Sequence, residues 1–294
     1  MNTTARVLIA GAALGVALPV GGVQASAAPA VTEYVALGDS WAADATLSQG
    51  TAEFVPGMCA QSRNNYAKQV AATLRVPVFR DATCGGAVTK NMTEPQQFPV
   101  GPANAPQFDS LSATTDLVTL EIGGNDAGLA ATVQACLTSD PALSVCKAAN
   151  AVDGGDRMSV KIAESEAKVR ATIDGIRERA PHARILLLDY LEGIGTVGGC
   201  FPTIPISDAD AVWLGSKLLE LNQMLARVAR ASNVEFVDTY STSGGHDACQ
   251  PAGVRWVEGL IPFSSNPVGL AVPFHPNQLG ADHQARSVLG VLGR

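Results

Sequence analysis

Four short polar or glycine-rich segments carry the residue types that acyl transfer needs. They are Gly38-Asp39-Ser40, Cys84-Gly85-Gly86-Ala87, Gly123-Gly124-Asn125-Asp126 and Phe274-His275-Pro276-Asn277. A serine hydroxyl is a poor nucleophile unless a base takes its proton. An imidazole titrates near neutral pH and can serve as that base. We therefore predict that Ser40 is a nucleophile and that His275 activates it.

Acyl transfer also places negative charge on the carbonyl oxygen of the substrate. Hydrogen-bond donors that are already in position stabilise this oxyanion, and each contributes about 2.7–4 kcal/mol. The candidate donors are the backbone N–H groups of Ser40 and Gly86 and the side-chain amide of Asn125. Because a glycine has no Cβ, the chain at Gly86 can approach a substrate closely.

The order of apolar segments predicts which elements position these residues. Short apolar runs predict strands at 33–37, 76–79, 116–122, 184–190 and 234–237. Apolar residues at helical spacing predict helices at 64–74, 159–180, 207–231 and 278–292. In the second of these helices the predicted apolar stripe includes Val160 and Ile162. Strands that alternate with helices indicate a mostly parallel sheet covered on both faces, in one domain. Ligands bind beyond the carboxyl ends of such strands, where three of the four segments lie.

The four segments together resemble the blocks of the SGNH, or GDSL, hydrolase family. That family has a Ser, a Gly, an Asn and a His in this order, which here are Ser40, Gly86, Asn125 and His275. Each motif alone is common in turns and helix caps, whereas all four in order are specific. The resemblance spans the chain from Glu33 to its C-terminus. No Gly-x-Ser-x-Gly occurs, which disfavours the nucleophile elbow of the α/β hydrolases.

This resemblance implies a fold and an activity. The fold is a flavodoxin-like three-layer α/β/α sandwich with a mostly parallel five-stranded sheet. The activity is hydrolysis of carboxylic esters, as by a lipase or esterase, through an acyl-enzyme on Ser40. No metal and no other cofactor is expected. The loops at 98–106 and 262–273 are apolar enough to border an acyl pocket.

The chain departs from the family pattern at one position. The family usually has an acid three residues before its histidine, and this chain has Val272 there. An acid in that place orients the imidazole and stabilises its charged form. We therefore expect a Ser40–His275 dyad in which the backbone carbonyl of Val272 holds Nδ1 of His275.

The first residues are typical of a secretory signal peptide. Arg6 precedes an apolar stretch at 7–20, and Ala25-Ser26-Ala27 fits a cleavage site. We predict a signal peptide at residues 1–27, a single mature domain at 28–294, and a secreted protein without a stable membrane anchor. An uncleaved anchor is the alternative, although the apolar stretch is short for a bilayer.

Six cysteines follow, and an even number in an exported chain predicts three disulfides. A metal site is disfavoured, because there is no Cys-x-x-Cys and the histidines do not cluster in the sequence. Fifteen pairings are possible. We favour pairing in sequence order, which closes local excursions and matches the layout of secreted actinobacterial lipases and esterases of this family. The pairs are then Cys59–Cys84, Cys136–Cys146 and Cys200–Cys249.

Composition narrows the classes of partner. The chain is 47% hydrophobic and 16% charged, which supports a packed core. Its formal net charge is -7 and its basic residues are scattered, which argues against nucleic acid. We expect a monomer that acts on a small-molecule or lipid ester. One alternative, favoured by the departure at Val272, is a catalytically weak or inactive carbohydrate- or lipid-binding protein on the same fold. A structural cell-wall protein is another.

Overall fold

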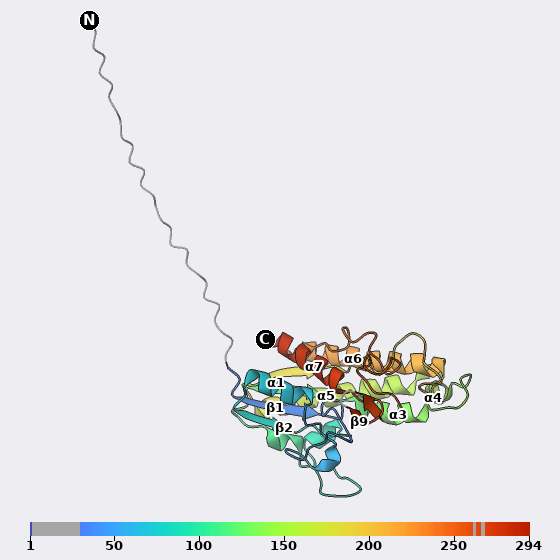
Figure 1. Cartoon of the computed structure of the whole chain (residues 1–294). Coiled ribbons are helices and arrows are strands. Elements are labelled where there is room, and N and C mark those ends of the chain that lie inside the picture. The colour runs from blue at the N-terminus through green and yellow to red at the C-terminus, as the bar shows by residue number, and fades with distance from the viewer. Residues whose placement is uncertain (2–29, 261–262, 266–267) are drawn as a thin grey trace. The chain divides into compact units, whose positions relative to one another are not determined.

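The centre of the fold is a five-stranded parallel sheet (Figure 1). The computed structural model describes residues 1, 30–260, 263–265 and 268–294, so the predicted signal peptide lies outside the described residues apart from Met1. The strands, in spatial order, are β2 (Val78–Asp81), β1 (Glu33–Gly38), β3 (Leu117–Glu121), β6 (Arg184–Leu188) and β7 (Glu235–Val237). All five strands predicted from the sequence are present, with ends shifted by at most two residues.

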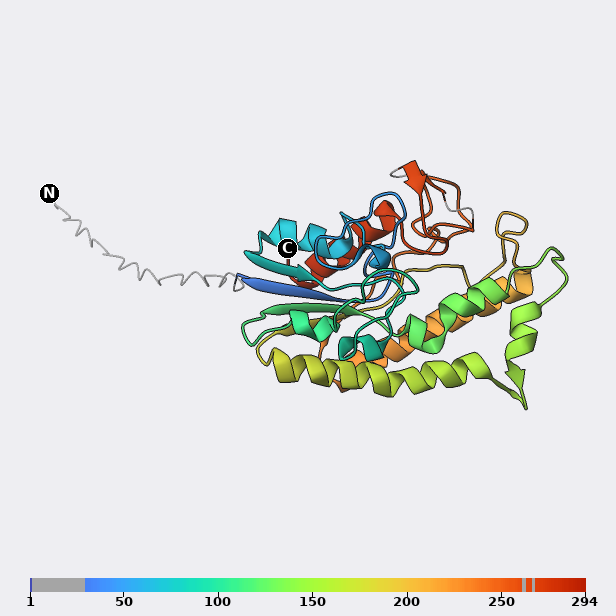
Figure 2. The same ribbon diagram turned by 90° about the horizontal axis from the view of Figure 1, so that it is seen from below.

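Helices cover both faces of this sheet. Figure 2 shows α1 (Tyr66–Leu74) and α7 (Gln278–Val291) above the strands and α5 (Arg157–Arg179) below them. The helix α6 (Asp208–Ala231) packs beside α5. Successive side chains of a strand point to opposite faces. Accordingly Tyr34 and Ala36 of β1 are buried on the side of α1 and α7, and Val35 and Leu37 on the side of α5 and α6. The predicted three-layer α/β/α sandwich is confirmed.

The strand order places the site-forming segments together. The chain passes from β1 to β2 at one edge and then returns to β3 on the other side of β1. In flavodoxin-like sheets the crevice lies where the strand order reverses, beyond the carboxyl ends of the strands. Here that point lies between β1 and β3. Gly38-Asp39-Ser40 follows β1 and Gly123-Gly124-Asn125 follows β3.

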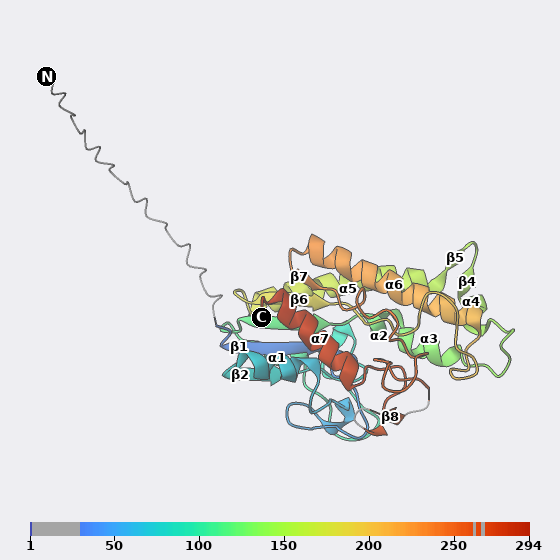
Figure 3. The same ribbon diagram turned by 45° about the horizontal axis from the view of Figure 1, so that its top comes forward.

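Several short elements were not predicted. They are α2 (Gly124–Ala127), α3 (Leu129–Ala135), α4 (Val145–Asn150), the pair β4 (Ala151–Val152) and β5 (Gly155–Asp156), the pair β8 (Phe263–Ser265) and β9 (Val268–Leu270), and three 3₁₀ turns at Gly57–Cys59, Thr89–Met92 and Gln107–Ser110. They are too short to show a hydrophobic period. Figure 3 shows α3, α4, β4 and β5 gathered beside one end of α6.

One position in the predicted apolar stripe of α5 is wrong. Val160 is 54% exposed, whereas Ile162, Val169, Ile173 and Ile176 are buried. The helix begins at Arg157, where the carboxylate of Asp156 accepts the N–H groups of Met158 and Ser159. Val160 therefore lies in the first turn, on the side that faces solvent.

Three disulfides cross-link the loops at the carboxyl end of the sheet. They are Cys59–Cys84, Cys136–Cys146 and Cys200–Cys249, which are the pairs expected in sequence order. Residues Val31–Arg294 form one compact unit. Within the part of the chain that the structure describes, no helix is long and apolar enough to cross a membrane.

Candidate active site

Ser40 lies on a tight turn directly after β1. The N–H of Asp39 donates to the carbonyl of Glu121 on β3, at 3.0 Å. Gly38 has φ 152°, and a Cβ there would lie 2.5 Å from that same carbonyl oxygen, so only glycine fits. After Ser40 the chain turns back, and the N–H of Ala45 donates to the carbonyl of Ser40 at 2.9 Å. The turn therefore fixes Ser40 at the switch point of the sheet.

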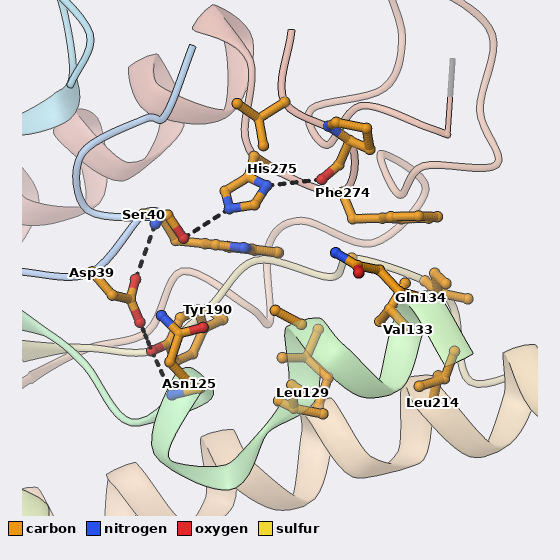
Figure 4. Close-up of a pocket in the computed structure, with 18 of the residues that line it drawn as sticks. Asp39, Ser40, Asn125, Leu129, Val133, Gln134, Tyr190, Leu214, Phe274 and His275 are labelled. Atoms are coloured by element: carbon orange, nitrogen blue, oxygen red, sulfur yellow. Dashed lines mark hydrogen bonds between the residues drawn. The ribbon is translucent and has the colours of Figure 1, made fainter. Parts of the chain in front are cut away.

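The imidazole of His275 contacts the hydroxyl of Ser40, although the two residues are 235 positions apart in the sequence. Nε2 of His275 lies 2.7 Å from Oγ of Ser40 (Figure 4). Nδ1 lies 2.8 Å from the carbonyl oxygen of Pro273. A carbonyl can only accept, so Nδ1 carries the ring hydrogen and Nε2 presents a lone pair to the hydroxyl. This tautomer can take the proton of Ser40.

The carbonyl that holds the imidazole belongs to Pro273, so the expectation for Val272 was wrong. The reason is a turn at Phe274, whose φ of 58° lies in the left-handed region. This turn brings the carbonyl of Pro273 back toward the ring two residues later. Backbone hydrogen bonds from Phe274 to Glu258 and from Glu258 to His275 hold the loop in place. Among the described residues, the partner of Nδ1 is this carbonyl and not a carboxylate.

Burial lowers the pKa of His275 below its ordinary value, and the hydrogen bond to the Pro273 carbonyl opposes this shift in part. The charged imidazolium loses solvation in the interior, and no counter-charge among the described residues replaces it. The neutral, proton-accepting form is therefore favoured at neutral pH.

Asn125 lies in α2, below Ser40 in the view of Figure 4. Its Nδ2 donates to the carbonyl of Ala87 at 3.0 Å. The neighbouring Asp126 accepts both the N–H and the hydroxyl of Thr89, at 2.9 and 2.6 Å. These bonds tie the segment after β3 to the segment after β2. One hydrogen of the Asn125 amide is thereby held, and the second can face a ligand.

Gly86 lies in the segment to which Asn125 is tied, but it is not part of the cavity wall beside Ser40. Its φ is 76°, in the region that favours glycine. The carbonyl of Gly85 accepts Nε2 of Gln96 at 2.7 Å. Because the peptide between Gly85 and Gly86 is planar and trans, its N–H points away from that bond. In the described residues no backbone acceptor takes this N–H.

An apolar cavity of about 440 Å³ opens beside the hydroxyl of Ser40. Ser40, Asn125 and His275 lie at one end of it, and its walls are mostly aliphatic and aromatic. The apolar lining includes Trp41, Leu129, Val133, Leu214, Leu218 and Phe274. These residues come from the turn after β1, from α3, from α6 and from the loop before His275. Of the two loops expected to border such a pocket, the one at 262–273 contributes Val272 and Pro273. The expectation for 98–106 was wrong, because α3 occupies that role.

Sequence reasoning also missed Tyr190, which lines the cavity and contacts Asp39. Tyr190 follows the apolar run of β6, and no motif marks it. In the sequence it resembles any buried aromatic residue at a strand end.

Comparison with known proteins identifies the family. The profile of the GDSL-like Lipase/Acylhydrolase family matches residues 36–283. The chain belongs to this family. Among curated relatives of this GDSL-like chain, Lipase 2 of Streptomyces coelicolor is 35% identical, over 92% of this chain and 90% of the relative. An esterase of Streptomyces scabiei is 27% identical, over 97% of this chain and 92% of its own.

Solved structures share the architecture of this GDSL-like chain. The extracellular lipase of Streptomyces rimosus superposes with a TM-score of 0.70 at 27% identity, covering 89% of this chain and 98% of that one. Phospholipase A1 of Streptomyces albidoflavus NA297 has a TM-score of 0.63 at 23% identity, covering 90% and 99%, and shares the fold. The resemblance predicted from the four motifs is thereby confirmed.

Proposed function

We propose that this chain hydrolyses carboxylic esters through an acyl-enzyme on Ser40. The observation that carries the proposal is the 2.7 Å contact between Nε2 of His275 and Oγ of Ser40, with Nδ1 held by the carbonyl of Pro273. As Oγ attacks the ester carbonyl, Nε2 takes the hydroxyl proton. The tetrahedral intermediate collapses, and the proton passes from Nε2 to the departing alcohol. A water molecule, deprotonated by His275, then releases the acid and restores Ser40.

The oxyanion of each intermediate needs donors that are set before the reaction. We assign this role to the N–H groups of Ser40 and Gly86 and to Nδ2 of Asn125. The contacts of Asn125 with Ala87 and of Gln96 with Gly85 hold two of these donors in fixed orientations. Donors that are already oriented need no reorganisation when the charge develops, which is the physical source of their effect.

A carbonyl in place of the family's acid changes the energetics of the base. The Pro273 carbonyl fixes the tautomer and the ring plane of His275, as a carboxylate would. It supplies only a dipole, so it stabilises the imidazolium less than a full negative charge. We therefore infer a Ser40–His275 dyad with a weaker base than a full triad provides.

The cavity supports an ester with an apolar acyl chain as the substrate. Its volume of about 440 Å³ falls within the usual range for small-molecule sites, and carbon atoms dominate its walls. Each methylene that leaves water for such a wall contributes about 0.8 kcal/mol. The curated relative named Lipase 2 agrees with a lipid ester.

We also propose that residues 1–27 are a signal peptide and that a single mature domain, 28–294, is secreted. Three disulfides support an oxidising compartment. The Streptomyces rimosus structure is described as an extracellular lipase, which points the same way. The compact unit of Val31–Arg294 supports one mature domain.

A fluorophosphonate probe tests the catalytic proposal directly. The wild-type protein should be modified at Ser40, as located by peptide mass spectrometry, and should release p-nitrophenol from p-nitrophenyl esters. Ser40→Ala should abolish both. Ser165→Ala is the matched control, because Ser165 is a buried serine on α5 whose hydroxyl, among the described residues, bonds the carbonyl of Lys161. A folded wild-type protein that is neither labelled nor active on esters of any chain length would contradict the catalytic proposal and favour a binding protein or a structural protein.

A further inference from the structure

The hydroxyl of Tyr190 bridges two strand ends that carry the proposed chemistry. It lies 2.6 Å from Oδ2 of Asp39, the residue before Ser40, and 2.9 Å from the backbone nitrogen of Gly124, the residue before Asn125 (Figure 4). Tyr190 itself follows β6. One oxygen atom therefore links the carboxyl ends of β1, β3 and β6.

The direction of each hydrogen bond follows from the protonation states. Burial raises the pKa of Tyr190 well above its ordinary value, so the phenol keeps its proton. The hydroxyl donates that proton to Asp39 and accepts the N–H of Gly124. A hydroxyl is one of the few groups that can donate and accept at once, which suits this bridging place. Phenylalanine has the same ring and can do neither.

On one side the bridge controls the turn that holds Ser40. The other oxygen of Asp39, Oδ1, accepts the N–H of Trp41 at 3.0 Å. Asp39 is almost fully buried, so its orientation depends on these few partners. The turn that presents the N–H of Ser40 is thus held by a carboxylate whose second oxygen is bound to Tyr190.

On the other side the bridge controls the start of α2. A Cβ at Gly124 would lie 3.1 Å from the hydroxyl oxygen of Tyr190 and 3.2 Å from its Cζ. Because Gly124 has no Cβ, the phenol of Tyr190 can occupy this space. The bond to Gly124 fixes the Gly123–Gly124 peptide, one peptide before the one that leads into Asn125, whose side-chain amide is a proposed oxyanion donor.

Tyr190 is itself rigidly held. The side chain of Asn222 on α6 accepts the N–H of Tyr190 at 3.1 Å and donates to its carbonyl at 2.7 Å. The ring of Trp41 packs edge-on against the Tyr190 ring, with centroids 5.4 Å apart. Because α6 anchors Tyr190, the hydroxyl of Tyr190 can set the spacing between the segments that follow β1 and β3.

We propose that Tyr190 is a positioning residue, whose hydroxyl sets the place of the Ser40 N–H relative to the Asn125 amide. The inference rests on the proposed function and extends it to the support of the oxyanion site. Oxyanion donors act at 2.7–3.1 Å from the developing charge, so displacements of a few tenths of an ångström reduce their effect. Binding of the apolar acyl chain does not depend on that spacing.

The test is Tyr190→Phe in the full chain. Removing the hydroxyl leaves Oδ2 of Asp39 and the N–H of Gly124 without this partner. We expect kcat for a p-nitrophenyl ester to fall about ten- to hundredfold, which is less than the loss of a whole oxyanion donor. KM should stay within about twofold. The rate of labelling by a fluorophosphonate should fall in parallel with kcat, because it uses the same donors.

Tyr66→Phe is the matched control. Tyr66 is also fully buried, and its hydroxyl donates to Thr119 at 3.2 Å without reaching the cavity. Both variants lose one buried phenol hydroxyl, so a purely structural role predicts similar losses of melting temperature and no difference in kcat. A wild-type kcat in Tyr190→Phe, or an equal loss in both variants, overturns the proposal. A wild-type protein without esterase activity overturns the proposed function instead.

A second variant keeps the proposal testable if Tyr190→Phe is not recovered folded. Asp39→Asn preserves the shape of the side chain but replaces one of its two oxygens by an NH₂ donor, so it cannot accept both the phenol hydrogen of Tyr190 and the N–H of Trp41. We expect the same loss in kcat with little change in KM. The double variant should lose hardly more than either single variant, because both break one link. Losses that multiply, or an Asp39→Asn variant with wild-type kcat, contradict the bridge.

Discussion

The carbonyl oxygen of Pro273 and Nδ1 of His275 lie 2.8 Å apart within a single turn of the chain. The group that orients the proposed base therefore belongs to the same loop as the base. A carboxylate elsewhere in the fold is not needed to select the tautomer. The turn depends on the left-handed conformation of Phe274 and on its backbone bond to Glu258.

The pH dependence of catalysis should report the burial of His275. Because burial lowers the pKa of its imidazole, the neutral base should persist below the ordinary value of about 6.5. The acid limb of kcat/KM should accordingly have its midpoint below about pH 6.5. A pH profile of p-nitrophenyl ester hydrolysis, run in non-reacting buffers, measures this. A midpoint at pH 7 or above would indicate a nearby negative charge and contradict the dyad.

The preference of the enzyme for acyl chains of a given length should depend on Leu218, which lines the cavity from α6. Leu218→Trp fills part of the cavity, so the acyl chain loses about two methylenes of burial at about 0.8 kcal/mol each. We expect the ratio of kcat/KM for a decanoyl ester to that for an acetyl ester to fall about tenfold. Leu289→Trp, on the other face of the sheet, is the control and should leave the ratio unchanged. An unchanged ratio in Leu218→Trp would place the acyl chain elsewhere.

The stability of the protein should fall as the pH rises through the titration of its buried acids. Burial raises the pKa of Asp44 to about 8, against an ordinary value of 3.8, and raises those of Asp39 and Asp189 to about 7. The native state holds protons that the unfolded chain releases. The stabilisation is therefore complete below about pH 4 and is lost as the pH approaches 8. Each such acid contributes a slope of up to about 1.4 kcal/mol per pH unit between these limits.

Asp44→Asn tests how much one of these acids contributes to the pH dependence of stability. Asn has the same shape and tolerates the left-handed φ of 49° at this position. We expect a smaller difference between the free energies of unfolding at pH 5 and pH 8 than in the wild type. Asp109→Asn changes an exposed acid and should leave the difference as it was. Urea unfolding with the disulfides intact measures it, and identical pH dependence in wild type and Asp44→Asn would show that Asp44 is ionised in the fold.

The disulfides should differ in their contribution according to the loop that each closes. Cys136–Cys146 spans 10 residues and Cys200–Cys249 spans 49. In the chain-entropy account, the longer loop gives about 1.4 kcal/mol more stabilisation. Replacing the Cys200–Cys249 pair by serines should therefore lower the free energy of unfolding by about that much more than replacing Cys136–Cys146. The opposite order would mean that native packing around the shorter bridge dominates.

The sequence by itself determined the architecture and the proposed reacting groups. Apolar runs of strand length alternating with long amphipathic helices permit few arrangements, because parallel strands need helical crossovers. The glycines at 38 and 123 marked sharp turns at strand ends. Ser40 and Asn125 were named from such places and His275 from the segment before the last helix, and the structure brings all three to one cavity.

The tertiary structure alone decided which groups touch them. The carbonyl that accepts the Nδ1 hydrogen of His275 belongs to Pro273, because Phe274 adopts the left-handed conformation. The backbone torsions of a single loop residue leave no periodic signal in the sequence. The cavity that we propose for the acyl chain is lined by α3, which is too short to show a hydrophobic period. Tyr190 reaches Asp39 across 151 positions and has no sequence motif, because a hydrogen bond between strand ends depends on sheet order rather than on neighbouring residues.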